Sequence, residues 1–186
     1  MRETAHPWLR SVATILSLVL FLWCVEIANI ASGNRLVYFS IYPRHVASLP
    51  GIFIWPFLHA SINHLLVNTT PLVVLGYFVA LRGVGVFIKT CIVITLIGGA
   101  GIWLFGRPAY HIGASGLVLG FFGFLVTVGI YERSLQALLI GLFTLLYYGG
   151  LILSIVPTNQ FISWEAHLFG LIGGVVAGRL LPRLSS

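Results

Sequence analysis

The sequence predicts an all-α polytopic membrane protein in which six helices span the bilayer. Hydrophobic residues make up 59% of the 186-residue chain and charged residues only 8%. A soluble domain carries about 25% charged residues, so this chain has too few to cover a surface that faces water. Its apolar residues also gather into runs of about 20 residues, the length that a span needs. The lipid bilayer is therefore the expected surrounding of the fold.

Six apolar runs define the expected spans, and their mostly short connections favour antiparallel packing within a single domain, residues 1–186. The first run is longer than the apolar core of a signal peptide, so we expect a retained helix. The expected spans are residues 11–31, 63–81, 84–105, 115–131, 135–156 and 161–181. The one long connection, residues 33–60, is expected to hold a short interfacial or re-entrant piece, with Tyr42 and Trp55 at the lipid headgroups.

The basic residues predict that both termini are cytoplasmic. They are scattered singly between apolar runs, so the net charge of +6 indicates membrane topology and no nucleic-acid partner. With a cytoplasmic N-terminus, the cytoplasmic side holds Arg2, Arg10, Arg82, Lys89, Arg133, Arg179 and Arg183. The outer side holds only Arg35, Arg44 and Arg107. This excess on the cytoplasmic side follows the positive-inside rule.

Four polar residues, His64, Asn68, Ser115 and His167, lie within the apolar runs. A polar group in hydrocarbon is costly, so its presence indicates a function. Because every even-numbered span starts on the outer side, His64, Ser115 and His167 are expected at one depth, just below the outer surface. Asn68 follows His64 by four residues and so shares its helix face.

Stripes of small residues predict that the fourth and sixth spans pack closely. Gly116 and Gly120 are four residues apart in the fourth span, and Ala166, Gly170 and Gly174 repeat this spacing in the sixth. Such stripes let two helix backbones approach each other. The stripes could serve packing alone. Ser115 and His167 adjoin their outer ends, however, so close packing would bring the hydroxyl and the imidazole within hydrogen-bond reach.

This arrangement indicates a serine nucleophile, Ser115, with His167 as its general base. The start of the fourth span supplies free backbone N–H groups, so the oxyanion of an attacked carbonyl is expected to bind the N–H groups of Ala114 and Ser115. His64 and Asn68 could add side-chain donors. The alternative for Ser115 is a helix N-cap alone. Gly113 completes the set of small residues assigned to close packing around this site.

The chain contains no aspartate, so a Ser–His dyad is simpler than a triad. Glu26 is the one carboxylate left that could orient His167, because Glu165 is two residues away and points to another helix face. Zinc binding by His59, His64, His111 or His167 is disfavoured, since no H-E-x-x-H motif or carboxylate at ligand spacing accompanies them. We therefore expect no metal and no cofactor.

Three segments carry a resemblance to a known family. They are His59-Ala-Ser-Ile-Asn-His64-Leu-Leu-Val-Asn68, Gly113-Ala-Ser115-Gly116 and Ala166-His167-Leu-Phe-Gly170 followed by Gly174. In this order, on the second, fourth and sixth spans, they resemble the rhomboid intramembrane serine proteases over nearly the whole chain.

The resemblance implies a six-helix bundle with a Ser115–His167 dyad and an oxyanion site formed by the Ser115 N–H, His64 and Asn68. It also implies a water-filled cavity open to the outer side, with the fifth span and residues 156–163 as gate and cap. The expected substrates are single-pass membrane proteins, cut near the outer end of their span. Independently of the resemblance, the small size and the charge bias of the chain favour a bacterial inner membrane, with an organelle membrane as the alternative.

Two positions depart from the family pattern. Pro50-Gly51 stands where the family often has Trp-Arg, so the long loop is expected to be held differently. Leu119 stands where an aromatic residue often packs on the catalytic histidine, which predicts weaker support for the His167 ring. The competing hypotheses are a non-catalytic rhomboid-like protein that binds membrane clients, and a small transporter. A binder would need neither Ser115 nor His167, and a transporter would favour charged residues or broken helices at mid-membrane.

Overall fold

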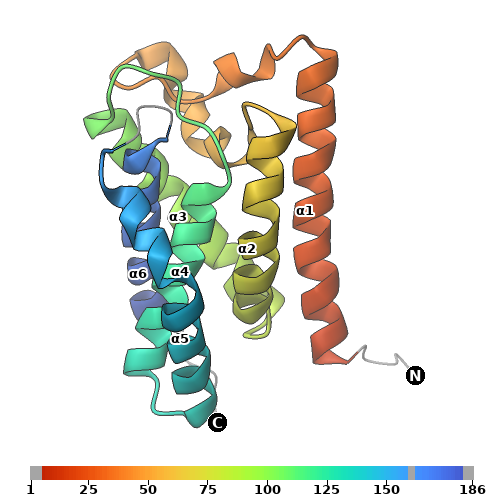
Figure 1. Cartoon of the computed structure of the whole chain (residues 1–186), viewed down its shortest axis with the longest axis vertical. Helices are drawn as coiled ribbons and strands as arrows, with labels where there is room; N and C mark the ends of the chain where they lie inside the picture. The colour runs from red at the N-terminus through yellow and green to blue at the C-terminus, as the bar shows by residue number, and fades with distance from the viewer. Residues whose placement is uncertain (1–5, 159–161, 182–186) are drawn as a thin grey trace.

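The computed structural model describes residues 6–158 and 162–181, and within them the chain folds into six α-helices joined by loops and short 3₁₀ helices (Figure 1). The all-α class is therefore confirmed. The α-helices are α1 Pro7–Ala31, α2 Ile62–Ala80, α3 Val84–Phe105, α4 Ser115–Tyr131, α5 Leu135–Tyr148 and α6 Trp164–Leu180.

The fifth expected span, residues 135–156, is not a single α-helix. The α-helix ends at Tyr148, and a 3₁₀ helix, η4 (Gly149–Ile155), continues the chain. The change falls at Gly149-Gly150, and glycine in a helix interior costs about 1 kcal/mol relative to alanine. The sixth span begins at Trp164 because the Ser163 hydroxyl caps the helix by accepting from the Ala166 N–H at 3.2 Å. Phe161 and the rest of residues 159–161, in the expected cap, lie outside the described residues.

Four segments are long and apolar enough to cross a membrane: Trp8–Ala31, Ile62–Ala80, Val84–Phe105 and Leu135–Ile155. Helix α4 is a shorter apolar helix of 17 residues. Large apolar side chains such as Leu138, Leu139 and Leu142 of α5 are about half exposed. An apolar outer surface of this kind suits contact with lipid, so the chain is a multi-pass membrane protein. The count of six spans and their orientation stay predictions.

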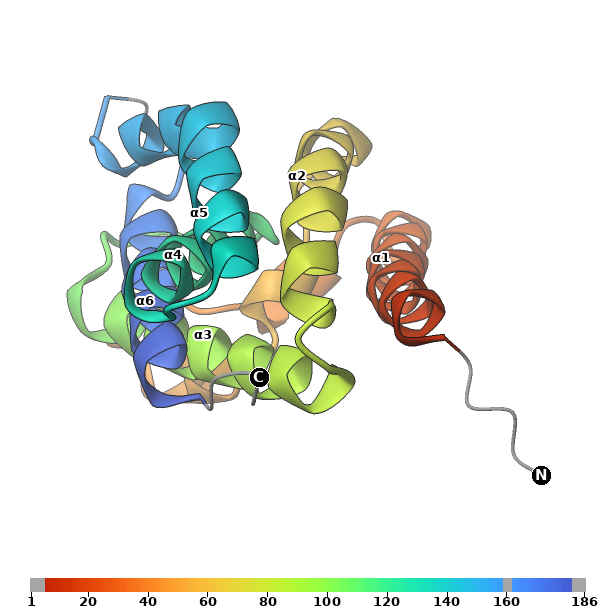
Figure 2. The ribbon, with the colours of Figure 1, turned by 90° about the horizontal axis from the view of Figure 1, so that it is seen from below.

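Helix α4 lies at the centre of the bundle, with α2, α3, α5 and α6 packed around it (Figure 2). Nearly every residue from Gly116 to Gly129 is buried. A helix enclosed on all sides must be apolar all round, as α4 is. Helix α1 lies at the edge, where it packs on α2 and its Ser11 hydroxyl donates to the Ala80 carbonyl at 3.0 Å.

The two glycine stripes meet between α4 and α6. A Cβ atom added to Gly174 would collide with the Gly120 carbonyl oxygen, and one added to Gly170 would collide with that of Gly116. The contact is thus backbone against backbone, which only glycine permits at these positions. It fixes the separation of the two helices that carry Ser115 and His167.

The long connection contains three 3₁₀ helices, η1 (Leu36–Phe39), η2 (Val46–Phe53) and η3 (Trp55–Phe57). Helix η2 packs on α3, and η3 packs on α3 and α4. Its Trp55 is fully buried and donates from Nε1 to the Thr95 carbonyl at 3.2 Å. The Trp55 ring therefore does not contact the lipid headgroups, and its depth in the bilayer stays a prediction. The ring instead fills the space left by Gly98 and Gly116, whose added Cβ atoms would strike it. Tyr42 is half-buried.

Pro50-Gly51 stands where related sequences often have Trp-Arg, and here Gly51 holds the loop by close backbone contact. An added Cβ atom would lie 2.5 Å from the carbonyl carbon of Ser40. The loop is further held by Arg44, whose guanidinium donates to the carbonyls of Leu104 and Gly106 at 3.2 and 2.9 Å. At this point the loop is therefore held by the close contact between the backbones of Gly51 and Ser40, without a tryptophan.

Candidate active site

The N-terminal ends of α2, α4 and α6 lie at one end of the bundle, here called the cavity end. Ser115 is the first residue of α4 and His167 the fourth of α6. The Ser115 Oγ lies 2.8 Å from the His167 Nε2, a hydrogen-bond distance. The glycine contact described above sets the α4–α6 separation that makes this distance possible.

The other ring nitrogen of His167, Nδ1, lies 3.1 Å from the Ser154 carbonyl oxygen in η4. A carbonyl can only accept, so Nδ1 carries the proton and Nε2 is left to accept from the Ser115 hydroxyl. This corrects the expectation for Glu26, which lies buried on α1 and accepts a hydrogen bond from Asn29 of the same helix at 3.3 Å. A backbone carbonyl has no sequence signature, so sequence reasoning missed this partner.

Two expected oxyanion donors are free to bind a ligand. The Asn68 side chain is 6% exposed, and its Nδ2 has no partner within the described chain. The Ser115 N–H likewise has no acceptor among residues 6–158 and 162–181. A buried donor without a partner costs about 1–3 kcal/mol, so these groups are suited to a ligand that supplies the acceptor. His64 lies beside them, and its ring lines the same cavity.

The Ala114 N–H is not available for this role, which corrects the expectation that it binds the oxyanion. It donates to the Nε2 of His59 at 3.2 Å. His59 is fully buried in the loop before α2, and burial lowers its pKa to about 3, so the ring is neutral and can accept. The His59 ring also packs edge to face on His64, with centroids 5.2 Å apart. His59 thus supports the start of α4, a role that the sequence did not reveal.

Gly113 serves the site and not helix packing, because it lies before α4 with a φ of +119°. Glycine adopts this conformation at little cost. A Cβ atom there would lie 2.8 Å from the His64 ring and 3.7 Å from the Ser115 Oγ. Any side chain at this position would therefore fill the space between the Ser115 hydroxyl and the His64 ring.

A cavity of about 660 Å³ opens over these groups. Its wall combines His64, Asn68, Ser115 and His167 with residues from the loop before α4 and the segment before α6. Those that sequence reasoning did not assign include Arg107, Tyr110, His111 and Ser163. Leu119 is buried in the core of the bundle. Within the described chain no three His, Cys, Asp or Glu side chains gather as a metal site would need.

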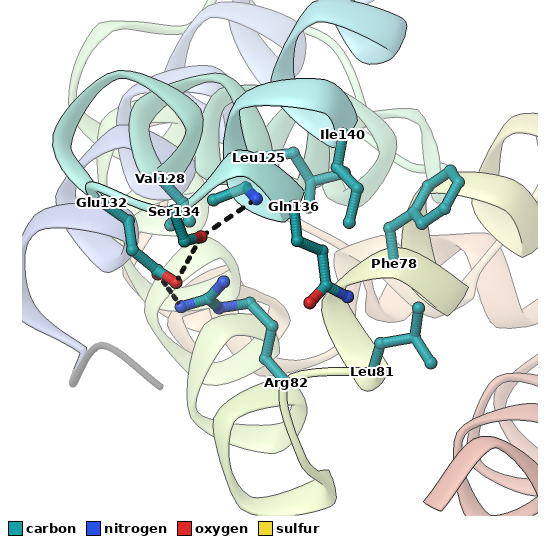
Figure 3. Close-up of a pocket in the computed structure, with 10 residues that line it drawn as sticks. Phe78, Leu81, Arg82, Leu125, Val128, Glu132, Ser134, Gln136 and Ile140 are labelled. Atoms are coloured by element: carbon teal, nitrogen blue, oxygen red, sulfur yellow. Dashed lines mark hydrogen bonds and ion pairs between the residues drawn. The ribbon is translucent and has the colours of Figure 1, made fainter. Parts of the chain in front are cut away.

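A second pocket lies at the other end of the bundle, where α2 and α4 end and α5 begins (Figure 3). It is small, about 20 Å³. The Arg82 guanidinium forms an ion pair with the Glu132 carboxylate there, and both side chains are about nine-tenths buried. The Ser134 hydroxyl also donates to Glu132, at 3.3 Å, and caps α5 by accepting from the Ala137 N–H. The charges of Arg82 and Glu132 are thus paired, although the Arg82 Nε has no hydrogen-bond partner within the described chain.

The rhomboid domain family matches residues 47–184 of this chain. An uncharacterized protein of Mycobacterium tuberculosis is 40% identical over 97% of this chain and 79% of its own length. An uncharacterized protein of Mycobacterium bovis gives the same values. One of Mycobacterium leprae is 37% identical over 94% of this chain and 72% of its own. With the match covering most of its length and the geometry above, the chain belongs to the rhomboid family.

Proposed function

We propose that this protein is an intramembrane serine protease that cleaves the transmembrane segments of single-pass membrane proteins. The observation that carries the proposal is the 2.8 Å contact between Ser115 Oγ and His167 Nε2 at the wall of a large cavity. A client-binding protein would have no need to hold a hydroxyl against the accepting nitrogen of an imidazole.

In the proposed reaction, His167 Nε2 takes the Ser115 proton as Oγ attacks the scissile carbonyl. This proton transfer makes the His167 ring an imidazolium. The Ser154 carbonyl stabilises it by accepting a hydrogen bond from Nδ1–H. The oxyanion accepts hydrogen bonds from the Ser115 N–H, Asn68 Nδ2 and the His64 ring. His167 then gives the proton to the leaving amine. Water next attacks the acyl carbon as His167 takes its proton. The bond between the acyl carbon and Ser115 Oγ then breaks, His167 returns the proton to Oγ, and the carboxylic-acid product leaves.

The proposed setting is a bundle of six spans with both termini in the cytoplasm of a bacterial inner membrane. Helices α2, α4 and α6 run parallel, so the cavity end would lie toward the outer side. The excess of basic residues on the opposite side supports this orientation. Substrates would be cut near the outer end of their span, where a helix must unwind to present its carbonyl.

Labelling with a fluorophosphonate tests the nucleophile directly. We expect the detergent-solubilised wild type to react, and expect Ser115→Ala and His167→Ala to remain unlabelled. Equal labelling of wild type and Ser115→Ala would refute the assignment. A folded wild type that does not react would instead favour the non-catalytic, client-binding alternative.

A further inference from the structure

The loop before α4, residues 106–114, is fastened to the N-terminal end of α6 by several polar contacts. The Arg107 N–H donates to the Glu165 carboxylate at 3.1 Å, and its guanidinium donates to the Ile162 carbonyl. Further along the loop, His111 Nδ1 lies 2.6 Å from the Ser163 hydroxyl. The loop that precedes Ser115 is thus hydrogen-bonded to the segment that precedes His167.

His111 is the centre of this contact and is only 1% exposed. Its backbone N–H donates to the Ile41 carbonyl at 3.0 Å, and its own carbonyl accepts from the Ser40 hydroxyl. Its ring Nε2 lies 3.0 Å from the Arg107 carbonyl. One residue therefore joins the long loop, the loop before α4 and the cap of α6.

The partners of the ring fix its protonation. Burial lowers the pKa of His111, against opposing effects of its bond to the Arg107 carbonyl and of the Glu165 charge, so the ring is neutral near pH 7. The Arg107 carbonyl can only accept, so Nε2 carries the proton and Nδ1 accepts from the Ser163 hydroxyl. Ser163 in turn accepts from the Ala166 N–H at 3.2 Å, so no group in this chain of bonds is left without a partner.

Ser163 also forms a backbone hydrogen bond with the first turn of α6, which carries His167. Its carbonyl accepts from the backbone N–H of His167 at 3.2 Å. Any shift of Ser163 would therefore move the backbone of His167, whose ring must stay within 2.8 Å of Ser115. A misplacement of about 1 Å can cost a factor of about 100 in rate.

We propose that His111 is a positioning residue for the catalytic pair: through the Ser163 hydroxyl it holds the first turn of α6 so that His167 faces Ser115. His111 acts through Ser163 and does not touch the reacting atoms. The proposal rests on the proposed function, because the position that it maintains is that of the Ser115–His167 pair.

The test follows the labelling of Ser115 by a fluorophosphonate over time at increasing reagent concentrations. It yields the rate constant at saturation, the concentration for half-maximal rate and the final labelled fraction. We expect His111→Phe, which keeps a ring but loses both bonds, to lower the rate constant by about tenfold or more. The labelled fraction and the reagent concentration for half-maximal rate should stay unchanged. His111→Asn, whose amide oxygen can replace Nδ1 as an acceptor, should stay within about threefold of wild type.

Variants of the partners separate positioning from general loss of stability. Ser163→Ala should slow labelling as His111→Phe does, Ser163→Thr should not, and the double variant should be no slower than either single one. Ser134→Ala, which removes the cap of α5 at the other end, should leave the rate unchanged.

Some outcomes would overturn the proposal. Labelling of folded His111→Phe and Ser163→Ala at the wild-type rate would do so, as would an equal slowing in Ser134→Ala. If His111→Phe does not fold, the comparison of Ser163→Ala with Ser163→Thr decides. A wild type that is not labelled would remove the proposed function and this role together, an outcome distinct from labelled variants that behave as wild type.

Discussion

The two ends of the bundle differ in the size of their cavities and in the partners of the polar groups that line them. At the cavity end, Asn68 Nδ2 and the Ser115 N–H have no partners within the described chain, and a cavity of about 660 Å³ leaves room above them. At the other end, Arg82 and Glu132 form an ion pair around a pocket of about 20 Å³. The cavity end places unpartnered donors beside a large cavity that a ligand could enter, whereas the other end pairs two buried charges beside a pocket too small for one.

This contrast predicts that substitutions at the two ends affect different quantities. The largest effect should come from the proposed dyad. We expect Ser115→Ala, His167→Ala and the double variant each to lower substrate cleavage by about 10⁴-fold or more, with no additivity, because the two groups act as a unit. Thermal unfolding of each variant should stay near that of wild type. A cleavage assay on a membrane-embedded substrate checks this, and a double variant far slower than either single one would contradict it.

Asn68→Ala should give the next largest effect. Removal of one oxyanion donor costs about 10²–10³ in rate. Because Asn68 Nδ2 has no partner in the described chain, its loss should not destabilise the fold. Cleavage kinetics measured together with the thermal midpoint test both parts. A lower midpoint with an unchanged rate would place Asn68 among the structural residues.

Arg82→Ala should show the reverse behaviour. Breaking a buried ion pair by removing one partner costs about 3 kcal/mol of stability or more, because Glu132 would be left buried without its counter-charge. We expect a lower thermal midpoint, with the labelling rate of Ser115 in the remaining folded protein unchanged. Replacing both charges, in Arg82→Met with Glu132→Leu, should recover much of the stability. A slower labelling rate in the folded single variant would show that the two ends are coupled.

The smallest of these effects concerns the contact that joins α4 to α6. Gly174→Ala places a methyl group against the Gly120 carbonyl and should cost about 1–3 kcal/mol of stability through overpacking. Because the two helices must then move apart, labelling of Ser115 should also slow. The matched control is Gly85→Ala in α3, where nothing lies within 4 Å of the added atom. That control should be neutral or slightly stabilising.

Local patterns predicted the helices well. The bounds of α3 and α4 agree with the expected ones at both ends, since each helix begins after a glycine-containing break and is apolar throughout. The expected span 135–156 agrees with the apolar segment Leu135–Ile155, but hydrophobicity alone did not show that its α-helix changes to a 3₁₀ helix at Gly149-Gly150.

Features that depend on distant contacts could not be predicted from the sequence. The position of Trp55 depends on Gly98 and Gly116, which are remote in sequence and make room for the ring only after folding. The acceptor for the Ala114 N–H is His59, again distant along the chain. The site residues could be located because their positions within the apolar runs and their spacing along the chain are local properties. Their supporting partners, such as the Ser154 carbonyl and His111, have no such pattern.

The backbone contact between Gly120 and Gly174 has a consequence for how the protein responds to its lipid surroundings. No side chain lies between the two helices there, so no change of rotamer can alter their spacing. Helix α4 is also shielded from lipid by its neighbours, whereas α1 and α5 present large apolar side chains outward. We therefore expect changes in bilayer thickness or lipid composition to act first on the outer helices, while the distance between Ser115 and His167 stays insulated from them.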